Sequence, residues 1–139
     1  MRRMSARGTV LAALTVLLCV GCASMSEIRP LAVSIPVGES ATFERLQAVA
    51  RSRGYTPVEV NPYAGTFVID AQRRARPSEI VRFRVECSRD GFAMVLPIGP
   101  RVDRRGSVYH LPSAVRDEYV DLVVAFTQVL HPGRDEATP

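Results

Sequence analysis

Apolar and polar side chains alternate along residues 79–88, and this alternation constrains the fold more than any other feature of the chain. Successive side chains of a β-strand point to opposite faces, so the segment predicts a strand with one apolar and one charged face. The apolar positions are Val81, Phe83, Val85 and Cys87, and the polar ones are Arg82, Arg84, Glu86 and Ser88. A sheet with one apolar face needs a second layer to cover it.

A second strand follows this one after a tight turn. Arg89-Asp90-Gly91 is typical of a hairpin turn, and residues 92–98 predict the returning strand. Its larger apolar side chains, which share one face, are Phe92, Met94, Leu96 and Ile98. A further hairpin is predicted upstream, because Asn-Pro and a Gly within residues 61–65 separate two strand-like segments. Those segments are residues 55–60 and 66–71, and weaker strand signals lie at 31–37 and 108–111.

Two segments have helical rather than strand periodicity. The first follows Gly38-Glu39-Ser40 and ends before Gly54, which suits the left-handed position after a helix. Its apolar side chains are Phe43, Leu46, Val49 and Ala50. The second begins at Pro112-Ser113 and ends at His131-Pro132-Gly133. Its apolar stripe is Val115, Tyr119, Leu122, Val123, Phe126, Val129 and Leu130.

Together these elements predict an α+β fold. We expect a two-layer sandwich in which two amphipathic helices cover a mostly antiparallel sheet of four to five strands. A chain of 139 residues is long enough for one compact core and too short for two. We therefore expect a single domain over residues 31–131, followed by a flexible tail over residues 132–139.

The N-terminus has the pattern of an export signal. Three arginines precede an apolar run over residues 10–20, which is shorter than the roughly 20 apolar residues of a membrane-spanning helix. The run ends in Leu18-Cys19-Val20-Gly21-Cys22, and Ala23-Ser24 follows. Over residues 1–24 the chain resembles the signal peptide and lipobox of bacterial lipoprotein precursors.

In that family a small residue precedes an invariant Cys, which is acylated before the signal peptidase cuts in front of it. Gly21 and Cys22 occupy these two positions, whereas Cys19 stands where the family usually has Leu. The resemblance implies a signal peptide over residues 1–21 and a lipid attached to Cys22. Residues 22–30 would then form the lipidated Cys and a polar tether.

Removal of the signal peptide changes the charge of the chain. All 18 basic residues are Arg, against 14 acidic residues and a net charge of +4. Cleavage before Cys22 would remove three arginines, which leaves 15 against 14 and a net charge of +1. The basicity of the whole chain therefore does not indicate nucleic-acid binding. Cys87 would remain as the one unmodified cysteine, and its place on the apolar strand face predicts a buried, unreactive thiol.

Two arginine-rich loops are the candidate contact sites. The loops are residues 72–78, with Arg73, Arg74 and Arg76, and residues 99–107, with Arg101, Arg104 and Arg105. In an antiparallel meander both loops would open at the same end of the sheet, and guanidinium groups there would bind carboxylate or phosphate. Anionic lipid headgroups, lipopolysaccharide phosphates or an acidic envelope protein would fit such a patch. The alternative is two solvated loops whose charges are balanced by acidic neighbours.

The sequence contains few other candidate residues for metal binding or catalysis. His110 and His131 stand at opposite ends of the last helix, roughly 30 Å apart, so the sequence predicts no metal site. It also lacks a G-x-S-x-G nucleophile motif. Asp117, Glu118 and Asp121 could do acid–base work as paired carboxylates, but we interpret them as solvated charges on a helix face. We therefore expect neither a catalytic site nor a cofactor.

The resemblance over residues 1–24 thus implies a membrane-tethered lipoprotein of the cell envelope, and we expect its folded domain to act as a non-catalytic binding or assembly module. The alternative is a small-ligand carrier or hydrolytic enzyme of the periplasm, which needs a concave pocket with converging polar groups. A binding module would instead expose an apolar or Arg-rich patch. Under the sorting rule of the lipoprotein family that the N-terminus resembles, Ala23 rather than Asp after the lipidated Cys implies the outer membrane, facing the periplasm, in a diderm host. A monoderm host would carry the protein on the outer face of its only membrane.

Overall fold

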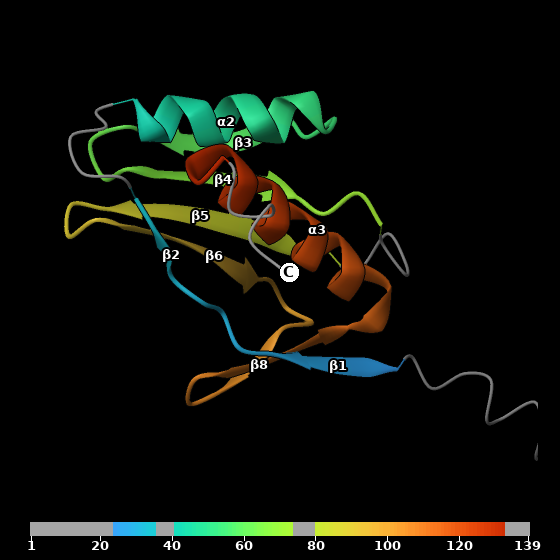
Figure 1. The fold of residues 1–139 in the computed structure, drawn as a ribbon. Coiled ribbons are helices and arrows are strands. Elements are labelled where there is room, and N and C mark those ends of the chain that lie inside the picture. Colours follow the sequence, from blue (N-terminus) through green and yellow to red (C-terminus); the bar gives the residue numbers. More distant parts are fainter. Residues whose placement is uncertain (1–23, 36–40, 74–79, 133–139) are drawn as a thin grey trace, which may run out of the picture.

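The computed structural model describes residues 24–35, 41–73 and 80–132, and they form an α+β fold of two helices and two antiparallel sheets. The strands are β1 (Met25–Ile28), β2 (Val33–Ser34), β3 (Pro57–Asn61), β4 (Thr66–Asp70), β5 (Arg82–Ser88), β6 (Phe92–Ile98), β7 (Asp103–Arg105) and β8 (Val108–Pro112). The helices are α2 (Thr42–Ser52) and α3 (Ser113–Leu130). Both helices lie on one face of the larger sheet, so the predicted sheet covered by two helices is confirmed (Figure 1).

The larger sheet has the order β2-β6-β5-β4-β3, and every neighbouring pair is antiparallel. Its two predicted hairpins are confirmed, with β3 paired to β4 and β5 paired to β6. Phe67, Phe83 and Val85 point toward the helices and are fully buried. The ring of Phe43 from α2 packs edge-on against Phe67, with 5.9 Å between their centroids.

The apolar row of β6 does not face the helices. Phe92, Met94, Leu96 and Ile98 share one face, as the sequence predicts, but that face is turned away from the helices, and all four are only partly buried. The register explains this orientation, because opposed residues of an antiparallel pair point to the same side of the sheet. Val95 lies opposite Val85 on the buried face, and Leu96 lies opposite Arg84 on the outer face.

A second sheet, β1-β8-β7, was not predicted. Residues 25–28, which the sequence analysis places in the tether over residues 22–30, form β1 instead. They pair with β8 along their whole length, and Ile28 is buried in the core. Residues 103–105 likewise form β7 within the predicted loop over residues 99–107. Both strands are too short to leave a local pattern and depend on pairing with β8.

The helices follow the predicted stripes. Leu46 and Ala50 of α2 are fully buried, and Gly54 takes a positive φ of 88° after the helix, where a side chain would be strained. In α3 the buried stripe includes Leu122 and Phe126, which pack into the same core as the strands. The helices also contact each other, so they form one continuous layer over the sheet (Figure 1).

Candidate functional site

Cys22, the predicted lipid attachment site, lies outside the described residues, as do the signal peptide over residues 1–21 and residues 133–139 of the predicted tail. The described chain begins at Ser24, whose carbonyl oxygen accepts a hydrogen bond from the backbone N–H of Ser113 at 2.9 Å. The hydroxyls of Ser26 and Ser113 also lie 2.7 Å apart. The point where the chain enters the fold is therefore fastened to the first turn of α3.

The two arginine-rich segments start at the same end of the larger sheet. Asp70 at the end of β4 lies opposite Arg82, and Arg82 lies opposite Ile98 at the end of β6. Gly99 then passes so close to Ile80 that a Cβ atom there would collide with the Ile80 carbonyl oxygen. Strand register thus brings the beginnings of both segments together.

The individual arginines have different surroundings. Arg74 and Arg76 lie outside the described residues, while Arg73 and Arg101 are exposed. Arg101 lines a shallow hollow beside Met25.

The remaining two arginines belong to the small sheet. The guanidinium carbon of Arg104 lies 5.4 Å from the centre of the Tyr109 ring, in a cation–π contact. The Nε of Arg105 lies 3.0 Å from a carboxylate oxygen of Asp103. Local contacts therefore tie Arg104 and Arg105 to the β7–β8 hairpin.

Glu118 is the polar residue whose role the sequence analysis missed. Its side chain is only 6% exposed, so the interpretation of this residue as a solvated charge is wrong. Tyr55 donates its hydroxyl hydrogen to Oε1 at 2.6 Å. The backbone N–H groups of Gln72 and Arg73 donate to Oε1 and Oε2 at 2.6 and 2.9 Å. Burial, and then the neighbouring Glu118 carboxylate, raise the pKa of Tyr55 well above its usual range.

This cluster joins three distant parts of the chain. Glu118 lies on α3, Tyr55 follows α2, and Gln72 opens the segment after β4. A signal for it was present in the sequence, because position 118 falls between Val115 and Leu122 on the buried side of the helix. Asp117 and Asp121 are exposed instead, so the three carboxylates do not converge.

The other chemically notable side chains have structural surroundings. Cys87 is partly buried against the core, and burial together with Glu44 raises the pKa of its thiol to about 11. The Nδ1 of His110 lies 4.0 Å from the Glu27 carboxylate, and the Nε2 of His131 lies 2.7 Å from the Ser34 carbonyl oxygen. Among the described residues, no three His, Cys, Asp or Glu side chains gather where they could hold a metal ion.

Large apolar side chains remain exposed in two regions. One region surrounds β1 and α3, and the other is the β3 hairpin. The exposed side chains are Met25, Leu31, Val120 and Val124 in the first region, and Val58, Val60 and Tyr63 in the second. The two regions lie on opposite sides of the molecule, with β1 at the bottom and β3 behind α2 at the top of Figure 1.

The first region contains a groove of about 330 Å³ between residues 27–31 and α3, called here the β1–α3 groove. Its lining is mainly aliphatic, with the charged side chains of Glu27, Arg29 and Arg116 among it. The lining residues are Glu27, Ile28, Arg29, Leu31, Arg116, Tyr119, Val120, Val123 and Val124. The hydroxyl of Tyr119 does not serve this groove, because it donates to the Val95 carbonyl oxygen at 2.9 Å. Burial raises the pKa of this hydroxyl to about 12.

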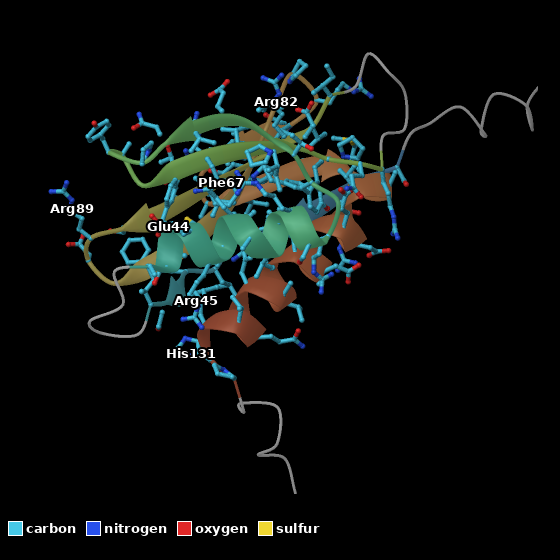
Figure 2. The ribbon with its side chains drawn as sticks, turned by 90° about the horizontal axis from the view of Figure 1, so that it is seen from above. Glu44, Arg45, Phe67, Arg82, Arg89 and His131 are labelled. Carbon is cyan, nitrogen blue, oxygen red and sulfur yellow. The ribbon has the colours of Figure 1, made fainter. Side chains whose placement is uncertain are left out.

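The face of the larger sheet that is turned away from the helices is more polar. Arg82 and Asp70 form an ion pair at 2.8 Å, and Arg84 lies 3.7 Å from Glu86. Figure 2 shows Arg82 at one end of the sheet and Arg89 at the hairpin turn of its other end. This face therefore combines paired charges with the half-buried apolar row of β6.

No protein-family model matches this chain, and no curated protein matches its sequence. Within the described ranges, neither helix has both the length and the apolar character needed to cross a membrane. What the chain does is therefore inferred from its N-terminal sequence and from these surfaces.

Proposed function

We propose that this chain is a lipid-anchored protein of the cell envelope, whose folded domain is a non-catalytic binding or assembly module. The observation that carries the proposal is the sequence Gly21-Cys22 at the end of a short apolar run, which resembles a lipobox. The acyl chains on Cys22 would hold the domain at a membrane surface. Ala23 favours the outer membrane, facing the periplasm, in a diderm host.

The surfaces of the domain support a module rather than a carrier or an enzyme. The β1–α3 groove is open and largely aliphatic, with Glu27, Arg29 and Arg116 along its walls, as in a surface that contacts another apolar surface. The buried carboxylate of Glu118 is occupied by donors from Tyr55, Gln72 and Arg73. These hydrogen bonds give it a role in holding the fold together.

Intact mass spectrometry of the protein from its native membrane fraction tests the anchor. The expected mass is that of residues 22–139 with acyl chains attached. A Cys22→Ala variant should leave the chain uncleaved and without acyl chains, since the acylated thiol is absent. A Cys19→Ala variant is the matched control, and it should be processed like the wild type.

The other masses contradict the proposal. A cleaved chain without acyl groups would indicate simple secretion and favour the carrier or enzyme alternative. An intact mass of all 139 residues for the wild type would mean that the apolar run is an uncleaved anchor.

A further inference from the structure

The β1–α3 groove adjoins the point where the chain enters the fold. We propose that this groove lies against the lipid bilayer to which the chain is anchored, so that the domain rests on the membrane with the groove facing the lipid. The inference rests on the proposed lipid attachment at Cys22. Beyond that attachment, the inference states how the domain is oriented and which of its surfaces contacts the lipid.

The first argument is the length of chain between the lipid and the fold. Only Ala23 separates Cys22 from Ser24, and Ser24 is held by the backbone of Ser113. An extended chain spans at most about 3.6 Å per residue, so a lipid attached to Cys22 can begin no further than about 7 Å along the chain from Ser24. A lipid on Cys22 therefore keeps the start of α3 close to the headgroups.

The second argument is that the groove begins at this point. Arg116 lies in the first turn of α3, and Val120 and Val124 follow it at intervals of one helical turn. With a rise of 1.5 Å per residue, these two valines lie about 10 and 16 Å from Ser113 along the helix. Leu31 approaches them from the other wall of the groove. The apolar surface thus extends away from the anchor along one side of the domain.

The third argument is the chemistry of the lining. Leu31, Val120 and Val124 are 73%, 41% and 46% exposed, and the interfacial region of a bilayer would remove them from water. Arg29 and Arg116 can reach lipid phosphates with their stems along the apolar surface. Glu27 offsets part of this positive charge, so the groove suits a zwitterionic surface as well as an anionic one.

Tryptophan fluorescence can test this orientation, because the natural sequence contains no Trp. The acylated full chain would be reconstituted into phosphatidylcholine vesicles as a Val124→Trp variant. The matched control is Val58→Trp, because Val58 is equally exposed at 46% but lies on β3. Leu31→Trp, at a 73% exposed position in the same groove, repeats the test in case Val124→Trp does not fold.

We expect the groove tryptophan to emit at shorter wavelength in vesicles than in a lipid-free form of the same variant, which is produced without residues 1–21 and carries Cys22→Ala. We also expect several-fold weaker quenching by iodide and strong quenching by brominated lipid. Val58→Trp should keep the emission and quenching of an exposed residue. The difference in emission and quenching between the two variants should persist at high salt, because apolar contact between the groove and the lipid is not screened by ions.

Two results would overturn the orientation while leaving the anchor intact. Equal iodide quenching at the two positions, in a chain whose mass confirms acylation, would show that the groove faces away from the lipid. Protection of Val124→Trp that persists in the lipid-free form would show that a second copy or another protein covers the groove. A chain without acyl groups would instead refute the proposed function itself.

Discussion

Removing the Glu118 carboxylate should destabilise the whole domain. A Glu118→Ala substitution deprives the Tyr55 hydroxyl and two backbone N–H groups of their acceptor. A hydrogen bond to a charged group contributes about 1.5–3 kcal/mol, and a buried donor left without a partner costs a similar amount. The Tyr55 hydroxyl is buried and incurs the full cost of about 2 kcal/mol. Gln72 and Arg73 are exposed, so water replaces part of what their N–H groups lose, at about 0.5 kcal/mol each.

The expected loss is therefore about 3 kcal/mol in the free energy of unfolding, measured by urea denaturation followed by circular dichroism. Asp117→Ala, at the exposed neighbouring position, should change stability by less than about 0.5 kcal/mol. A double-mutant cycle with Tyr55→Phe should give a coupling energy of at least about 1 kcal/mol. A Glu118→Ala loss below about 1 kcal/mol, or independent effects of the two substitutions, would refute the role assigned to this carboxylate.

Three further outcomes are expected. Cys87 should react with iodoacetamide about 50-fold more slowly in the folded protein than in urea at pH 9, because burial raises its pKa from an ordinary 9.0 to about 11. The folded-state pKa of the Cys87 thiol is higher than its unfolded-state value, so its contribution to stability is present below pH 9.0 and is lost as the pH rises through about 11. The free energy of unfolding should therefore fall over this pH range relative to that of Cys87→Ala. An unfolding free energy that stays flat relative to this control would contradict the expectation. Gly65→Ala should lower the free energy of unfolding by about 2 kcal/mol, measured by thermal or urea denaturation, because φ is 67° and a Cβ would lie 2.7 Å from the Cys87 carbonyl oxygen. Gly91→Ala is the control, because the space around Gly91 is open, and it should lower the free energy of unfolding by less.

Local periodicity predicted those parts of the fold that depend on few partners. The alternation in β5 and the stripe of α3 identify their buried faces because one row of side chains is apolar and the other is charged. In β6 both rows are apolar, since Val95 and Pro97 alternate with Leu96 and Ile98. Its orientation could therefore be found only from its register with β5.

Features that depend on distant partners left weaker signals. The four residues of β1 pair with β8 near the other end of the chain, so no local pattern distinguishes them from a tether. Glu118 stands in an apolar stripe, which marks it as buried, but its partner Tyr55 is 63 positions away. Strand register brings the beginnings of the two arginine-rich segments together, whereas Arg104 and Arg105 are paired within the β7–β8 hairpin. Lipid attachment at Cys22 stays a prediction, which the proposed mass measurement tests.

The pairing of β1 with β8 has a mechanical consequence for an anchored chain. A lipoprotein with a long linker can reach partners far from the membrane, because a flexible chain lengthens with the number of its residues. Here the residues that would form such a linker belong to β1, and the Ser24 carbonyl oxygen is hydrogen-bonded to the backbone N–H of Ser113. A lipid on Cys22 would hold the domain at the bilayer, so a partner has to approach the membrane itself. With the β1–α3 groove against the lipid, the β3 hairpin with Val58, Val60 and Tyr63 lies on the far side of the domain (Figure 1).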